Sequence, residues 1–196
     1  MRGTQIMVNL MNHDVFKQFI CSLKDASLPK REAGKLQLPH VTHSDVMAID
    51  FDKFTSKYAK SFDVKSTDDN PKSSDLLYQH KDGVIHLVEF KSSKPSKSGK
   101  DSVKLKALES LLTLMDLFGE IDREYARKYI VFILVFGEKK SIREEGRSRK
   151  LRNTGQPEII YCGLERLKGI YFKNVITKPA DDFESYIAEQ GWTSMI

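Results

Sequence analysis

The spacing of hydrophobic residues changes several times between the helical and the strand period along the chain. In the first third, apolar residues three and four positions apart predict one helix over about 13–25 and another that opens at His43 or Ser44. A short strand is expected at 61–65, and residues 66–74 are rich in turn-forming side chains. This part of the chain therefore predicts helices that lead into a turn-rich connection.

A β-hairpin is the clearest local feature of the pattern. Residues 75–80 and 84–91 are strand-like runs on either side of a three-residue loop that ends in Gly83. Glycine suits this position because it readily adopts the left-handed backbone conformation that such a loop requires. A loop of this length pairs His80 with Val84 and thereby sets the register of the whole hairpin.

The hairpin register brings charged residues together. It places Asp75 directly across from Glu89, and opposed side chains share one face of a sheet. Lys91, two positions after Glu89, joins the same face at the same end of the hairpin. His86 falls on the opposite face and is expected to pack or to lie at the surface rather than to take part in chemistry. A two-residue loop would shift the register by one position and separate the two carboxylates.

The rest of the chain alternates between helices and strands. A largely buried helix is expected from Asp101 or Ser102 to about Phe118, with Gly119 as its stop. The remaining expected elements are strands at 128–136, 158–162 and 170–175 and a helix at about 181–190. Trp192 is expected to pack against the core. This interleaving predicts an α/β domain with a mixed central sheet flanked by helices.

Composition narrows the protein class. A chain of 196 residues with 40% hydrophobic and 30% charged residues is globular, neither fibrous nor fully disordered. The longest apolar run, Tyr129–Phe136, is far shorter than the roughly 20 residues that span a bilayer. The N-terminal residues do not resemble a signal peptide, and Cys21 and Cys162 are isolated. We therefore expect a cytoplasmic protein with no membrane partner, no zinc site and no disulfide framework.

The positive charge is concentrated in the middle of the chain. The formal net charge is +5, and residues 91–155 alone hold 16 basic and 9 acidic side chains. Local excess of this kind suits a phosphate backbone, although a solvated loop and a solvated helix face would explain each cluster separately. The candidate nucleic-acid-binding residues are Lys94, Lys97, Lys100, Lys104, Arg147, Arg149 and Arg152.

Asp75 followed by Glu89-Phe90-Lys91, on consecutive strands with a helix and a buried strand after them, resembles the PD-(D/E)xK nuclease superfamily. The resemblance covers roughly 60–136 and implies a restriction-endonuclease-like fold, while Ser74 stands where the motif has proline. It identifies no subfamily. We expect a single domain over 1–196, with N-terminal helices in 1–60 and the nuclease core in 61–136. Residues 137–196 would add a basic loop, further strands and a C-terminal helix.

The chemistry of these residues suits hydrolysis of phosphodiester bonds in nucleic acid, preferably DNA. Asp75, Glu89 and the backbone carbonyl of Phe90 would hold Mg²⁺ or Mn²⁺, a hard cation that takes oxygen ligands. Lys91 would orient the attacking water and stabilise the developing charge. Many members of the superfamily add an acidic residue from the preceding helix. The candidates for that position are Asp45, Asp50 and Asp52, with Asp50 named as a further metal ligand.

Other functions remain open at this point. A carboxylate followed by Glu-x-Lys also arises by chance on an exposed hairpin. A non-catalytic nucleic-acid-binding or assembly protein could retain the same fold. A viral RNA endonuclease of the cap-snatching type is a third reading, but no metal-binding histidine is evident in the first helix. Stand-alone domains of this kind suggest a prokaryotic or virus-encoded protein, and a homodimer is one of the assemblies that we consider.

Overall fold

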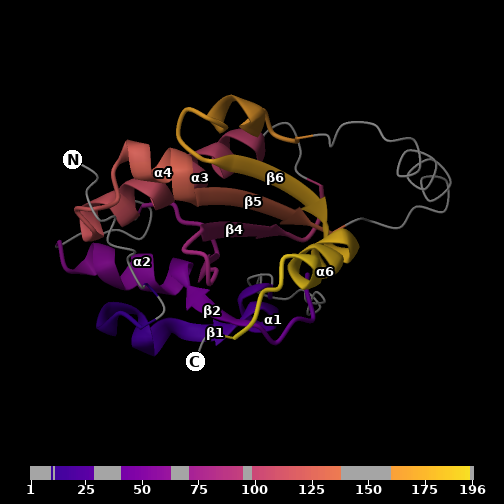
Figure 1. Ribbon diagram of the computed structural model, residues 1–196, viewed down its shortest axis with the longest axis horizontal. Helices are drawn as coiled ribbons and strands as arrows, with labels where there is room; N and C mark the ends of the chain where they lie inside the picture. The colour runs from indigo at the N-terminus through magenta and orange to yellow at the C-terminus, as the bar shows by residue number, and fades with distance from the viewer. Residues whose placement is uncertain are drawn as a thin grey trace, which may run out of the picture.

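The computed structural model describes residues 10, 12–28, 41–62, 71–94, 99–137 and 160–194. Its strands are β1 (Ile20–Ser22), β2 (Met47–Asp50), β3 (Leu76–Gln79), β4 (Ile85–Lys91), β5 (Ile130–Phe136) and β6 (Asn174–Pro179). They form one six-stranded sheet in the order β1-β2-β3-β4-β5-β6. Neighbouring strands are antiparallel from β1 to β4 and parallel from β4 to β6 (Figure 1). The α/β class with a mixed sheet is thereby confirmed.

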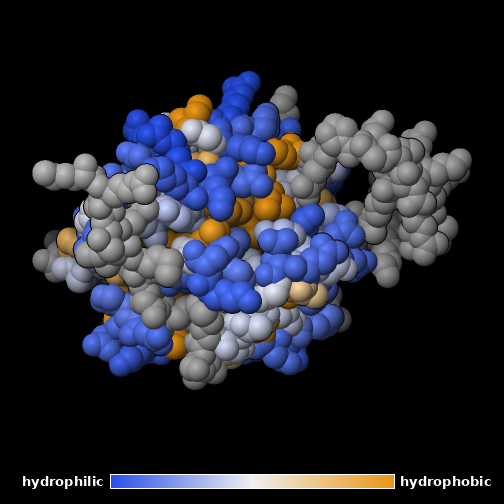
Figure 2. All heavy atoms as spheres, viewed as in Figure 1, coloured by the Kyte–Doolittle hydropathy of each residue, from blue (hydrophilic) through white to orange (hydrophobic). Residues whose placement is uncertain are grey.

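Helices cover both faces of this sheet. They are η1 (Asp14–Phe19), α1 (Leu23–Ala26), α2 (Phe51–Lys60), α3 (Gly99–Leu117), α4 (Arg123–Tyr129), η3 (Leu164–Leu167) and α6 (Ala180–Glu189). One core joins the sheet to α2, α3 and α4, and a second core joins its other face to α6. Figure 1 shows α6 beside the right-hand ends of the strands, and α3 and α4 toward the upper left. In Figure 2, hydrophobic side chains are visible over the middle of the sheet, among hydrophilic ones.

Strand β4 separates the two cores by simple alternation. Ile85 and Leu87 belong to the core on the α3 side, whereas Val88 and Phe90 belong to the core on the α6 side. By this alternation Glu89 falls among the apolar residues that face α3. The Glu89 carboxylate therefore occupies a position on β4 where the alternation of side chains predicts an apolar core residue.

The single helix predicted over 13–25 is wrong. The structure has the short helix η1, the edge strand β1 and one turn of helix α1 in its place. Ile20 pairs with Ile49 of β2, so a long-range strand contact overrides the helical spacing of the nearby apolar residues. Sequence periodicity cannot reveal this contact, because the partner strand lies almost 30 residues away.

The second helix begins later than predicted. Residues 47–50 form β2, and α2 starts at Phe51, where the Asp50 carboxylate accepts the Lys53 backbone N–H at 2.9 Å. The predicted apolar stripe survives in part, because Phe51, Phe54 and Tyr58 stack along the helix. Asp50 therefore closes a strand and caps a helix at the same time.

The later elements agree with the predictions to different degrees. Helix α6 lies within one residue of its predicted bounds, α3 starts two or three residues early, and β5 starts two residues late. Helix α4 was not predicted, although Asp122 caps it by accepting the Tyr125 N–H at 2.7 Å. The strand predicted at 170–175 is instead β6, which begins at Asn174, and residues 160–162 are not a strand. At these positions the chain first forms η3 and a turn, so apolar content alone misplaced the strands.

The residues that follow α6 close the second face of the sheet over β3. Trp192 stacks on Tyr78 with ring centroids 4.1 Å apart, and the Tyr78 hydroxyl donates to the Thr193 carbonyl at 3.2 Å. His86 packs beside them, 4.7 Å from the Trp192 ring. Trp192 is thus confirmed as a core residue, and His86 lies on the face opposite to α3 as predicted.

Several predictions fall outside the described residues. These include most of the predicted strand at 61–65, whose first two residues form a turn, and the basic stretch 138–155. The candidate nucleic-acid-binding residues Lys97, Arg147, Arg149 and Arg152 also lie outside them. In the part of the chain that the structure does describe, no helix is both long and apolar enough to cross a membrane.

Candidate functional site

The β3–β4 hairpin brings Asp75 and Glu89 together. Its loop contains Gly83 with φ of 87°, a left-handed conformation that glycine adopts without steric cost. The strands pair as the loop length predicts, with Leu76 opposite Val88. This register places Asp75, the residue just before β3, at the same level as Glu89. The predicted hairpin register is therefore confirmed.

Asp75 is held by donors from two elements. Its Oδ2 accepts the backbone N–H of Phe90 on β4 at 2.7 Å, and its Oδ1 accepts from Lys106 Nζ on α3 at 3.3 Å. Each carboxylate oxygen can accept more than one bond, so both retain capacity for a further ligand. The side chain is 19% exposed and can be reached from solvent.

Glu89 is fully buried and is flanked by two lysines. Its Oε2 lies 2.9 Å from Lys106 Nζ, and its Oε1 lies 2.7 Å from Lys91 Nζ. The contact with Lys91 has the distance of an ion pair but not the geometry of a hydrogen bond, so Oε1 retains an unused acceptor position. Lys106 therefore bridges the two carboxylates, and Lys91 approaches Glu89 from its other oxygen.

The electrostatics follow from burial and from this crowding of charge. Burial raises the pKa of Glu89 to about 7, and the nearby Asp75 carboxylate acts in the same direction. Burial lowers the pKa of Lys106, but attraction to Glu89 and Asp75 outweighs it, so the net shift is upward. Lys106 is consequently a permanent ammonium at neutral pH, whereas Glu89 can gain or lose a proton near neutrality.

These groups open on a cavity of about 380 Å³, hereafter the acidic cavity. Its carboxylates are Asp25, Asp50, Asp52, Asp75 and Glu89, and its lysines are Lys53, Lys91 and Lys106. Acidic groups outnumber basic ones, so a cationic ligand is favoured over an anionic ligand that arrives alone. A phosphate group would therefore need a cation to accompany it.

Two of the three candidate additional acids line the acidic cavity, and Asp45 does not. Asp50 is committed locally, because it caps α2 and its Oδ2 lies 2.6 Å from Lys53 Nζ. Asp52, in the first turn of α2, accepts a hydrogen bond from the Ser73 hydroxyl at 3.0 Å. The structure thus brings both near the carboxylate pair, each with a partner of its own.

The residues present fit a hard divalent cation. Mg²⁺ is usually held by one or two carboxylates and several waters rather than by a complete cage of protein ligands. Asp75 and Glu89 supply that donor set, because Asp75 Oδ1 and Glu89 Oε2 lie 3.3 Å and 2.9 Å from one point, the ammonium nitrogen of Lys106. Among the described residues, no three histidine, cysteine or carboxylate side chains converge as a ready-made metal group.

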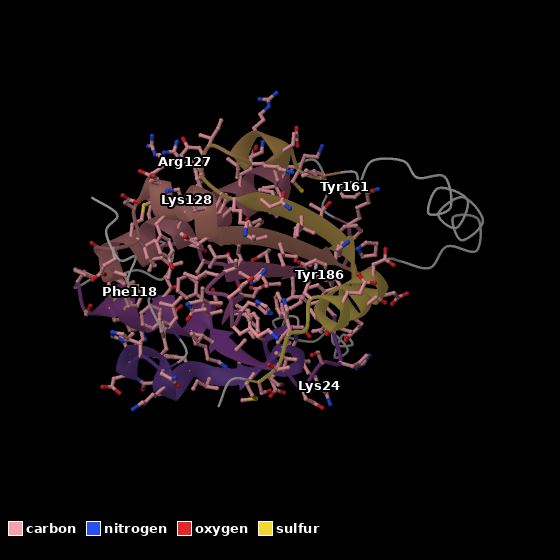
Figure 3. The ribbon with its side chains drawn as sticks, in the orientation of Figure 1. Lys24, Phe118, Arg127, Lys128, Tyr161 and Tyr186 are labelled. Carbon is pink, nitrogen blue, oxygen red and sulfur yellow. The ribbon has the colours of Figure 1, made fainter. Side chains whose placement is uncertain are left out.

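The described basic candidates gather beside the carboxyl end of β4. Lys94 Nζ lies 4.2 Å from the centre of the Tyr161 ring, a cation–π contact. Lys104 lies 3.7 Å from Asp101 and against the backbone at Gly163, while Lys100 belongs to the first turn of α3. Figure 3 shows Tyr161 near the ends of the parallel strands.

Strands β4 and β5 end side by side at one edge of the sheet. The two strands are parallel neighbours, so the chain leaves both at the same edge of the sheet. The Gly137 N–H donates to the Lys91 carbonyl at 2.8 Å, which ties the exit from β5 to the end of β4. Gly137, at the exit from β5, therefore lies next to Lys91 at the end of β4.

Sequence reasoning missed the role of Lys106. It was not among the candidate site residues, yet its ammonium group contacts both carboxylates from α3. A signal was present, because Lys106 sits within the buried stripe of α3 defined by Val103, Ala107 and Ser110. A lysine on such a stripe needs a buried anionic partner.

Comparison of the chain with protein-family models, curated proteins and solved structures finds no match in any of the three. The interpretation of the site therefore depends on its own geometry.

Proposed function

We propose that this chain is a metal-dependent nuclease with a restriction-endonuclease-like core, which hydrolyses phosphodiester bonds in nucleic acid, preferably DNA. One observation supports this most strongly. Asp75 Oδ1 and Glu89 Oε2 lie within 3.3 Å and 2.9 Å of the same nitrogen atom, so both can reach one shared cation. The order of the sheet and the helix that follows β4 agree with the resemblance drawn from the motif.

In this proposal, Asp75, Glu89 and the Phe90 carbonyl hold Mg²⁺ or Mn²⁺, with Asp50 as a further candidate. When bound, such an ion neutralises charge on the scissile phosphate and favours a nucleophilic water. Lys91 is 31% exposed at the mouth of the acidic cavity, with Glu89 fixing its ammonium group. From there it orients the water and stabilises negative charge on the phosphate.

The basic residues position the substrate. Lys94 lies against Tyr161, and Lys91, Lys100 and Lys104 all interact electrostatically with the neighbouring Cys162. Lys97, Arg147, Arg149 and Arg152 follow β4 and β5 in the sequence. We assign these residues to the sugar–phosphate backbone on both sides of the scissile bond, where contacts carry little sequence information.

Cleavage assays on the full chain test the proposal. Linear duplex DNA, single-stranded DNA, branched DNA and single-stranded RNA are incubated with Mg²⁺ or Mn²⁺. We expect cleavage by the native chain and none by Asp75→Asn or Glu89→Gln. Glu124→Gln, which alters an exposed carboxylate on α4, is the matched control and should cleave normally. Cleavage of RNA alone would support the viral endonuclease reading.

A second function is favoured by a specific observation. Lys91 and Lys106 together balance the charges of Asp75 and Glu89 without any added ion. A non-catalytic nucleic-acid-binding protein that retains the nuclease fold would show such a pairing. Binding of DNA without hydrolysis of any substrate, with either metal, would favour this second function.

A further inference from the structure

We propose that Lys106 is a built-in counter-ion that occupies the cation position between Asp75 and Glu89, so that a divalent metal must displace its ammonium group. This inference concerns the same site and rests on the proposed function. It assigns the control of metal affinity to Lys106 on α3, a residue that lies outside the hairpin motif.

The ammonium group of Lys106 lies between the two carboxylates. Lys106 Nζ lies 2.9 Å from Glu89 Oε2 and 3.3 Å from Asp75 Oδ1. A cation bound to both oxygens at about 2.1 Å would lie in the space between them. That space cannot hold a metal ion and an ammonium together, because the two charges would repel at very short range.

The charge of Glu89 is balanced within the folded chain. Glu89 is fully buried, and a buried carboxylate without a partner strongly destabilises a fold. Lys106 supplies that partner within the chain itself. The protein can therefore fold without metal, unlike small domains in which the metal itself stabilises the fold.

Lys91 and Lys106 differ in the carboxylates that they contact. Lys91 contacts Oε1 of Glu89, and Lys106 contacts Oε2 together with Asp75. Only Lys106 touches both carboxylates, so only Lys106 competes directly with a bridging cation. Lys91 can keep its contact while a metal binds on the other side of Glu89.

The acidic cavity can receive the ammonium group of Lys106 when a metal displaces it. The Lys106 side chain is 18% exposed, and it lines the acidic cavity rather than the closed core. Asp52 lines the same cavity and attracts Lys106 electrostatically. A rotation of the flexible side chain toward Asp52 would keep the ammonium paired while it vacates the oxygens that it now bridges.

Mn²⁺ binding to the full chain, measured by calorimetry and by the spin resonance of free Mn²⁺, tests the proposal. Lys106→Met removes the charge and keeps an unbranched apolar side chain. We expect Lys106→Met to bind Mn²⁺ about tenfold or more tightly than the native chain. Lys106→Arg keeps a charge that can span both carboxylates, so its affinity should equal the native value or fall below it. Lys128→Met, on the exposed surface of α4, should leave affinity unchanged.

Thermal unfolding provides a second readout. With a chelator present, Lys106→Met should melt at a lower temperature than the native chain. Mn²⁺ should raise the melting temperature of Lys106→Met by more than it raises that of the native chain. If Lys106→Met does not fold, Lys106→Arg decides, because Mn²⁺ binding tighter than native by that variant would overturn the proposal. Native or weaker affinity in a folded Lys106→Met would also overturn it. Absence of Mn²⁺ binding by every folded variant would instead refute the metal-dependent function on which the proposal rests.

Discussion

The backbone N–H of Phe90 and the carboxylate of Asp75 are joined by a 2.7 Å hydrogen bond across the end of the β3–β4 hairpin. This bond holds the side chain of Asp75, one candidate metal ligand, against the main chain of Phe90, whose carbonyl is another candidate ligand. The orientation of Asp75 thus depends on the backbone of β4 as well as on the Lys106 side chain. Any substitution at Asp75 changes the hairpin as well as the site.

Replacement of Asp75 by alanine should destabilise the fold. The Phe90 N–H would lose its acceptor and Lys106 would lose one partner, so we expect the free energy of unfolding to fall by about 1–3 kcal/mol. Asp75→Asn keeps an oxygen that can accept from Phe90 and should lose less. Urea denaturation of both variants measures the difference. Equal losses would show that the hydrogen bond contributes little.

Glu89 should make stability depend on pH. Its pKa is raised from 4.5 to about 7 in the folded chain, so the folded state binds this proton more tightly than the unfolded state. The stability that the protonated group contributes is complete below pH 4.5 and is lost as the pH rises toward 7. The loss should reach at most about 3 kcal/mol.

Comparison with Glu89→Gln isolates this effect, because glutamine does not titrate. Free energies of unfolding are measured for both chains between pH 4.5 and 8. The native value should decrease relative to that of Glu89→Gln as the pH rises. Parallel curves would mean that Glu89 has an ordinary pKa in the folded chain.

Gly137 should not tolerate a side chain. A Cβ at this position would lie 2.5 Å from the Ser92 carbonyl oxygen, a backbone atom that cannot easily move. We expect Gly137→Ala to lower the free energy of unfolding by about 1–3 kcal/mol. Gly119→Ala is the matched control, because nothing lies within 4 Å of its added Cβ. Similar denaturation midpoints for the two variants would contradict the prediction.

Nucleic-acid affinity should fall steeply with salt if the described lysines contact phosphates. Replacing Lys94, Lys100 and Lys104 one at a time by glutamine should reduce the slope of log affinity against log salt by about 1 each. Lys128→Gln, on α4, should leave the slope unchanged. Fluorescence anisotropy with labelled duplex DNA of two unrelated sequences measures both quantities. An unchanged slope in all three variants would make these lysines part of a solvated surface.

The sequence predicted the elements whose determinants are local. Gly83 at the end of a three-residue loop was sufficient to set the β3–β4 register, because turn geometry fixes which residues oppose one another. Helix α3 was also recognised from its own apolar content and the glycine beyond its end. In both cases the residues that decide the structure lie next to one another in the chain.

The elements that were missed depend on distant partners. Strand β1 is a strand because Ile20 pairs with Ile49, and the helical spacing around it gave no sign of that contact. The spacing along α3 could have shown that Lys106 faces the core, but the carboxylates that it meets there depend on how α3 packs against β4. The hairpin register is therefore accessible from a sequence such as this, whereas the partners that other elements bring to the site are not.

The contacts on the two faces of β3 also bear on the order in which the chain is synthesised. On one side, the backbone of Ser74 and the hydroxyl of Ser110 on α3 are joined at 2.7 Å, and on the other side Tyr78 lies under Trp192. Trp192 leaves the ribosome more than 100 residues after the hairpin. For most of translation, β3, the strand that follows Asp75, thus lacks the cover on its second face. A ribosome-bound chain that ends before Trp192 should consequently expose Tyr78 to solvent and to chaperones.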